Sequence, residues 1–380
     1  MMKSVSKYKV ELGIVIPLIL FFIISILTIY SAGNIIPSTM GNIALKQTLW
    51  YIVGFAIAYF IMYIGVDYLL KYAWFLYGTG VLSLVLLLFI GTPINDARCW
   101  FAIGNIATIQ PSEFMKVFLI LALAKVIDEF NTSNSKPTLK EEFYLLIKVF
   151  IIAAIPSVLT FLQPDTGIVI IYFFITMTML LISGIRYRWF VIIFSIILSI
   201  GGIFLSLYFF KSDLFINIFG TNFFYRVDRL LDWQSGDGMQ LGNAMTAIGS
   251  SGLFGFGLKG TPIYFPEAHT DFIFSVYASN FGLIGSTFLI GLLTFFDLKI
   301  ITIGLKSNQN SNKYIIAGIT GMLLYQQVQS IGMNIGLLPI TGITLPFISY
   351  GGSSLLSYMI IAGIIFNLSN QTLRFWNIKK

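Results

Sequence analysis

Three titratable side chains lie within five residues of one another: Glu267, His269 and Asp271, in the segment PEAHTDFIF at 266–274. A long apolar block follows, so the segment is predicted to lie at the mouth of a membrane-spanning helix. Partial removal from water raises the pKa of a carboxyl group from about 3.9 toward the range in which it works as a general base. Asp271 is therefore our candidate base, and the alternative is a simple helix cap.

A second charged pair, Glu113 and Lys116, lies inside a helix predicted to start near residue 110. The two residues are three positions apart, so they share one face of that helix. Ionisable groups inside a span cost several kcal/mol unless they are paired or face a polar cavity. The pair either fixes helix packing or forms a cavity wall that receives an anionic headgroup. Arg98 and Trp100, just upstream, are suited to a phosphate and to an aromatic anchor at the membrane surface.

Two further polar segments interrupt apolar sequence. QPDTG at 163–167 lies between two predicted helices, and the interpretation we favour is a corner in which Asp165 or Thr166 caps the second helix. Asp165 would nevertheless lie on the same side of the membrane as Asp271. The segment 338–354 contains Ser349 and many small polar residues. These residues either allow close helix packing or form a cavity floor in which backbone amides bind an anion.

Two common site types are excluded. Gly255, Gly257 and Gly260 match the GxGxxG spacing, but no strand precedes them and no βαβ unit surrounds them, so a tight turn is predicted instead of a dinucleotide site. The chain has one His and one Cys, which is too few for the usual zinc ligand set.

The composition defines the elements that position these residues. Only 10% of the 380 residues are charged, whereas a soluble domain carries about 25%. The apolar residues form long blocks, which must be helices if they cross a membrane. We therefore predict an all-α polytopic membrane protein with about ten transmembrane helices, which start near residues 12, 45, 72, 110, 143, 167, 189, 271, 314 and 347.

The distribution of basic residues predicts the orientation. With both termini in the cytoplasm, sixteen of the 23 Lys and Arg residues lie on or near the inside. The net charge of +7 fits an inner leaflet with anionic lipids, and no basic cluster is dense enough for nucleic acid. The long loop 211–270, which contains Arg226, would then be outside, and its many aromatic residues predict an ordered loop.

Four segments together resemble the SEDS family of bacterial cell-wall proteins, which includes RodA, FtsW and SpoVE. They are IQPSE-x-x-K at 109–116, QPD-x-G at 163–167, PEAHTDFIF at 266–274 and LPFISYGGSS at 345–354. The resemblance covers nearly the whole chain, including the large loop between the seventh and eighth helices, and the short termini resemble RodA more than FtsW. It implies one integral membrane domain over residues 1–380, in the bacterial cytoplasmic membrane.

The resemblance also implies a function. Proteins of this family are peptidoglycan glycosyltransferases that polymerise lipid II at the outer membrane face, for cell wall synthesis and cell shape or division. Asp271 matches the essential acidic residue of the family, Glu113 and Lys116 match its charged pair, and Arg226 matches the arginine of its Tyr-Arg segment. A class B penicillin-binding protein is the implied partner, besides membrane lipids.

The expected mechanism follows from these matches. Asp271 would take the proton of the acceptor 4-hydroxyl, while Arg226, Lys116 and Arg98 hold the oxygens of the leaving diphosphate. Glu267, Asp165 and Ser349 are further expected substrate contacts. A divalent cation, Mg²⁺ or Mn²⁺, that bridges diphosphate to Asp or Glu is also expected, because hard cations prefer oxygen ligands.

The chain departs from the family pattern at several positions. Cys99 replaces a basic residue, Ser330 replaces Asn, Ser279 and Asn280 replace an acidic pair, and Asn243 and Ala244 replace Gln-Ser. Two rival functions therefore stay open. A flippase would move the lipid-linked precursor through a continuous polar path, whereas the acidic residues here gather outside. A catalytically weak scaffold would recruit a penicillin-binding protein.

Overall fold

Ten long helices make up most of the described part of the chain, as the sequence predicts. The structure is a computed structural model that describes residues 11–35, 41–94, 97–104, 107–221, 224, 227 and 239–378. Within these residues the long helices are α1 (Leu12–Ala32), α2 (Ile43–Ile64), α4 (Ala73–Ile90), α5 (Pro111–Ser133), α6 (Leu139–Leu162), α7 (Thr166–Ile182), α8 (Tyr187–Phe210), α12 (Ile273–Lys306), α13 (Asn310–Asn334) and α14 (Gly352–Ile378). The prediction of an all-α polytopic membrane protein is confirmed.

The apolar helices surround the more polar ones. Seven of the described helices, namely α1, α2, α4, α6, α8, α12 and α14, are long and apolar enough to cross a membrane. Helix α5 carries Glu113 and Lys116, and it packs against α4, α6, α7, α13 and α14. Its charged residues are therefore shielded from lipid by its neighbours, which is how a membrane protein tolerates them.

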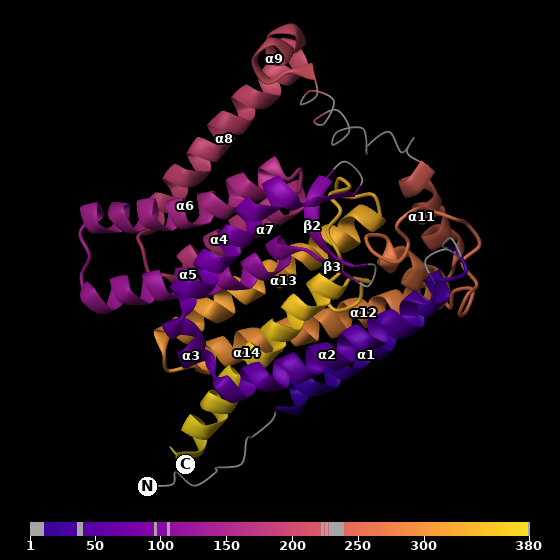
Figure 1. Cartoon of the computed structure of the whole chain (residues 1–380), viewed down its shortest axis with the longest axis horizontal. Coiled ribbons are helices and arrows are strands. Elements are labelled where there is room, and N and C mark those ends of the chain that lie inside the picture. Colours follow the sequence, from indigo (N-terminus) through magenta and orange to yellow (C-terminus); the bar gives the residue numbers. More distant parts are fainter. Residues whose placement is uncertain are drawn as a thin grey trace.

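A small antiparallel sheet, which the sequence did not predict, connects α4 to α5. Its strands are β1 (Thr92–Ile94), β2 (Ala97–Ile103) and β3 (Ala107–Ile109), with Phe101 opposite Ile109. Side chains alternate between the two faces of a strand. Cys99 is accordingly buried while Arg98 is exposed. In Figure 1 the sheet lies at the same end of the helix bundle as α11 (Met239–Ser250), and the short helix α3 (Val66–Lys71) lies at the other end.

The long loop begins on a part of the chain that projects from the bundle. Helix α8 and the short helix α9 (Ser212–Phe219) extend away from the other helices (Figure 1), and Tyr208 is the one buried residue among those described in α8. The predicted order of the loop is confirmed after residue 239, where α11 and the turns before α12 pack around Phe265 and Phe272. Arg226 lies outside the described residues.

The GxGxxG segment closes a break in α12. Helix α12 is interrupted at Gly282, where φ is 63°. The loop at 252–257 replaces the missing helical hydrogen bonds: Phe256 N donates to Ser279 O at 2.9 Å, and Leu283 N donates to Gly252 O at 3.0 Å. The predicted tight turn is therefore confirmed, and its glycines serve packing against α12.

Substitution of Gly255 tests this packing. A Cβ atom at Gly255 would lie 2.3 Å from the Asn280 carbonyl oxygen, whereas one at Gly257 meets nothing within 4 Å. Both residues have positive φ, at 77° and 80°. Gly257→Ala is expected to cost about 1 kcal/mol of unfolding free energy for the left-handed backbone alone, and Gly255→Ala clearly more. Unfolding by SDS in mixed micelles measures both, and equal losses would contradict the close contact.

Candidate active site

One cavity of about 1030 Å³ brings the four polar segments of the sequence together. It lies at the end of the bundle where α2, α5, α7, α12 and α14 begin. Its walls include residues from each predicted motif, namely Gln110 and Glu113, Pro164 and Asp165, Glu267 to Asp271 except Ala268, and Tyr350 to Ser354. Segments that are far apart in the sequence thus form a single polar pocket.

The cavity is rich in carboxylates, and two of them, Asp165 and Asp271, lie just before the helices α7 and α12. Burial and the neighbouring charges of Glu267 and Asp165 raise the pKa of Asp271 to about 7. Burial and the charge of Glu113 raise the pKa of Asp165 to about 6. A carboxyl with a pKa near neutrality combines a sizeable ionised fraction with useful basicity, which is what a general base requires.

The turn that carries Asp271 is held by backbone contacts from two sides. Phe272 N donates to Glu267 O at 3.0 Å, which closes the turn. From the segment 345–350, Ser349 Oγ donates to Thr270 O at 2.6 Å, and Tyr350 N donates to His269 O at 2.9 Å. Ser349 is buried and does not line the cavity, so its hydroxyl supports the turn and is not directed at a ligand.

Asp165 caps a helix and also faces the cavity. Its Oδ1 accepts from Ile168 N at 3.4 Å, so it caps α7 as we favoured. Its Oδ2 accepts from Gln110 Nε2 at 2.8 Å, and the residue also lines the cavity. Asp165 therefore ties the start of α7 to the start of α5 while it contributes negative charge to the pocket.

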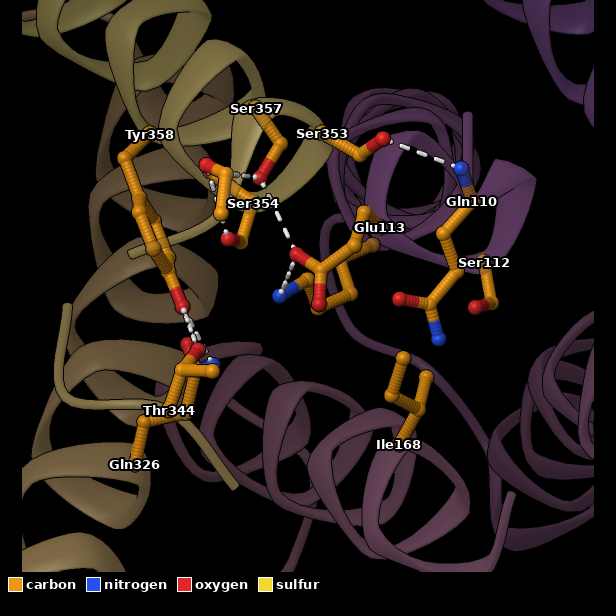
Figure 2. A network of polar contacts seen from close by, with 12 residues as sticks. Gln110, Ser112, Glu113, Ile168, Gln326, Thr344, Ser353, Ser354, Ser357 and Tyr358 are labelled. Carbon is orange, nitrogen blue, oxygen red and sulfur yellow. Dashed lines mark hydrogen bonds and ion pairs between the residues drawn. The ribbon is translucent and has the colours of Figure 1, made fainter. Parts of the chain in front are cut away.

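Glu113 and Lys116 form an ion pair with only one member facing the cavity. The distance from Lys116 Nζ to Glu113 Oε2 is 2.6 Å. Ser357 Oγ of α14 donates to the same carboxylate at 3.3 Å (Figure 2). Lys116 Nζ lies 5.0 Å from the ring centre of Tyr358. Glu113 lines the pocket, whereas Lys116 is fully buried behind it. The pair fixes helix packing and forms a cavity wall, but Lys116 is not placed to touch a ligand directly.

The basic residues of the pocket differ from those that we expected. Arg98 is exposed on β2 and does not line the cavity, and Arg226 lies outside the described residues. Among the residues that the structure describes, Lys46 at the start of α2 is the basic side chain that does line it. Lys46 was not among the predicted site residues, although its place at a helix start, on the same predicted side as the motifs, could have indicated a site residue.

The described residues do not form a complete ligand set for the expected divalent cation. No group of three or more His, Cys, Asp or Glu side chains that could hold a metal is present in the described part of the chain. Mg²⁺ usually needs only one or two carboxylates together with substrate phosphates. Glu267, which lines the cavity, therefore fits the carboxylate share of such a site and leaves Asp271 free to act as a base.

Three of the departures from the family pattern are used in packing. Burial and the charge of Asp165 raise the pKa of the Cys99 thiol to about 12, and its Sγ donates to Gln163 O at 2.8 Å. Asn280 Nδ2 donates to Ser31 Oγ at 2.7 Å, which links α12 to α1. Asn243 Nδ2 donates to Tyr264 O at 2.8 Å within the long loop.

The comparisons with known proteins cover almost the whole chain. A family model described as "Cell cycle protein" (FtsW, RodA and SpoVE) matches residues 12–374. The probable peptidoglycan glycosyltransferase FtsW of Coxiella burnetii is 31% identical over 97% of this chain and 99% of its own length. Stage V sporulation protein E of Bacillus subtilis is 30% identical over the same shares of the two chains.

Two solved structures are similar in fold over almost the whole chain. A chain of a peptidoglycan synthase complex that coordinates polymerization and crosslinking has a TM-score of 0.76 and 25% identity, over 96% of this chain and 98% of that one. The rod shape determining protein RodA of Thermus thermophilus has a TM-score of 0.67 and 26% identity, over 95% and 97%.

The buried ion pair yields a stability prediction. Glu113→Gln leaves the Lys116 charge unpaired in the interior and is expected to cost about 3–5 kcal/mol of unfolding free energy. The double variant Glu113→Gln with Lys116→Met removes both charges and is expected to recover most of that loss. SDS unfolding in mixed micelles measures both. A double variant as unstable as the single one would show that the pair is not what stabilises this contact.

Proposed function

Because the chain belongs to the FtsW/RodA/SpoVE family of cell cycle proteins, we propose that its cavity polymerises lipid II into glycan strands, with Asp271 as general base. It is a peptidoglycan glycosyltransferase of cell wall synthesis and a multi-pass protein of the cytoplasmic membrane. The observation that carries the proposal is the meeting of the four motifs around one partly buried carboxylate, Asp271.

The reaction requires a base for the incoming hydroxyl. The ionised carboxylate of Asp271 takes the proton of the acceptor 4-hydroxyl, whose oxygen attacks the anomeric carbon of the donor muramyl sugar. The bond from that carbon to diphosphate breaks, and the leaving diphosphate keeps the electron pair. General base catalysis of this kind contributes typically about 10²–10⁴-fold to a rate.

The leaving diphosphate needs positive charge near the pocket. Lys46 lines the cavity and is our first candidate for this contact. Arg98 is exposed on the adjacent sheet, next in sequence to Cys99, which lines the cavity, and is a second candidate. A divalent cation held by Glu267 would neutralise further charge on the diphosphate.

The topology and the partner are also part of the proposal. We place both termini in the cytoplasm and the cavity at the outer face, because this arrangement leaves sixteen of the 23 basic residues inside. A class B penicillin-binding protein is the proposed partner. It is supported by the similar chain from a synthase complex that coordinates polymerization and crosslinking.

Neither rival function has a specific observation in its favour. A flippase needs a polar path across the membrane, whereas the cavity carboxylates gather at one end of the bundle. A weak scaffold was favoured by the sequence departures, but Cys99, Asn243 and Asn280 each hold a defined packing contact. The geometry therefore supports an active polymerase best.

Replacement of the proposed base tests the catalytic assignment. Asp271→Asn is expected to lower polymerisation at least about 100-fold, because the amide cannot accept the proton. Purified protein is incubated with labelled lipid II and the partner, and glycan strands are identified by muramidase digestion. Asp67→Asn, at the exposed helix α3 on the opposite end, is the matched control. Polymerisation by the Asp271 variant at the wild-type rate would contradict the assignment.

The pH dependence follows from the raised pKa of Asp271. The base works when ionised, so the rate is expected to fall about tenfold per pH unit below about pH 7, and to level off above it. Glu267→Gln removes a neighbouring negative charge that raises the pKa of Asp271, so it should move this limb to lower pH. An acid limb near pH 4 in the wild type would mean that the working carboxyl is not desolvated.

A further inference from the structure

Asn334 is the last residue of α13 and is fully buried. Its side-chain nitrogen donates to Asp271 O at 2.9 Å and to Ser330 O at 2.7 Å. Its side-chain oxygen accepts from Ser275 N at 3.0 Å and from Ser275 Oγ at 2.6 Å. A carboxamide offers two donors and two acceptor lone pairs, so this one is fully used.

These contacts lie where the turn at 267–272, which carries Asp271, leads into α12. The first N–H groups of a helix have no partner within the helix and need a cap. Phe272, at the N-cap position of α12, has no side chain that can accept. Ser275 N donates to Phe272 O at 3.1 Å and also to the side-chain oxygen of Asn334 on another helix, and the nitrogen of the same side chain holds the backbone carbonyl of Asp271.

The geometry points to Asn334 as a positioning residue: we propose that its amide fixes the backbone of Asp271 so that the carboxylate faces the cavity at the productive depth. The inference rests on the proposed function. Asn334 does not line the cavity and so touches no substrate, and it acts through the backbone of Asp271.

Ser330, one helical turn before Asn334, does not share this role. It accepts from the Asn334 amide through its backbone carbonyl, and its own hydroxyl is buried without a hydrogen-bond partner among the described residues. Asn334 is therefore the side chain of α13 that holds the Asp271 carbonyl.

The two sides of the turn have different anchors. Ser349 Oγ holds Thr270 O from the segment before α14, and Asn334 holds Asp271 O from α13. Misplacement of a catalytic group by about 1 Å can cost about 100-fold in rate. Loss of the α13 anchor should therefore affect kcat, while substrate binding by the cavity wall is retained.

Asn334→Ala tests the proposal. We expect kcat for polymerisation of lipid II to fall about tenfold to 100-fold with KM changed less than about twofold. The acid limb of the pH–rate profile should also move to lower pH, because a loosened turn lets water reach the carboxylate of Asp271. The other titratable groups that line the cavity around Asp271, and that stay unchanged in the variant, are Lys46, Cys99, Glu113, Asp165, Glu267, His269 and Tyr350.

Two further variants keep the test decisive if Asn334→Ala does not fold. Asn334→Asp keeps the shape and the acceptor toward Ser275, but it sets a carboxylate oxygen against two backbone carbonyls and should lower kcat as well. Ser275→Ala removes the contact from Ser275 Oγ alone and should give a smaller loss with the same direction of pH shift. Asn312→Ala, at the far end of α13, removes another buried amide and should leave the acid limb in place.

A readout that does not depend on turnover separates this inference from the proposed function. A hydrophobic carbodiimide labels protonated carboxyl groups, and mass spectrometry reports the labelling of Asp271 at each pH. Asn334→Ala should move this labelling curve to lower pH relative to wild type and to Asn312→Ala. Wild-type kcat, or a reduced kcat with the acid limb and labelling curve unmoved, would overturn the positioning role. A wild-type protein that makes no glycan strands would instead contradict the proposed function.

Discussion

The structure depends on keeping one carboxylate partly out of water at the entrance to a membrane helix. Desolvation of Asp271, with the charges of Glu267 and Asp165 close by, opposes its ionisation and keeps its pKa near neutrality. Such a carboxylate requires a firmly held backbone and polar surroundings. The hydrogen bonds of the turn at 267–272 hold the backbone, and the cavity supplies the polar surroundings.

The rest of the bundle makes this polar pocket tolerable in a membrane. Charged and amide side chains are concentrated on α5 and α13, which lie among apolar helices. Glu113 and Lys116 neutralise each other where α5 meets α14, so that the wall of the pocket presents a carboxylate without an unpaired buried charge. The start of α5 is tied through Gln110 to Asp165 at the start of α7 and to Ser353 at the start of α14.

The sequence predicted the helices well because the membrane imposes strong rules on composition. Charge-free blocks must be helices, and the motif residues lie at their ends. It did not predict the sheet at 92–109, since two of its three strands have only three residues and leave no readable periodicity. The spacing of Glu113 and Lys116 placed both on one helix face but not their depth, so Lys116 was expected at the ligand. Lys46 was overlooked because an isolated lysine at a helix start resembles an ordinary flanking charge.

The most direct test of the account is a structure of the protein with a lipid-linked acceptor and a non-hydrolysable donor bound. The account predicts the acceptor 4-hydroxyl within about 2.6–3.2 Å of the Asp271 carboxylate, with the donor diphosphate on the Lys46 side of the same cavity. A complex in which Asp271 faces acyl chains, or in which the two sugars meet away from it, would contradict the account.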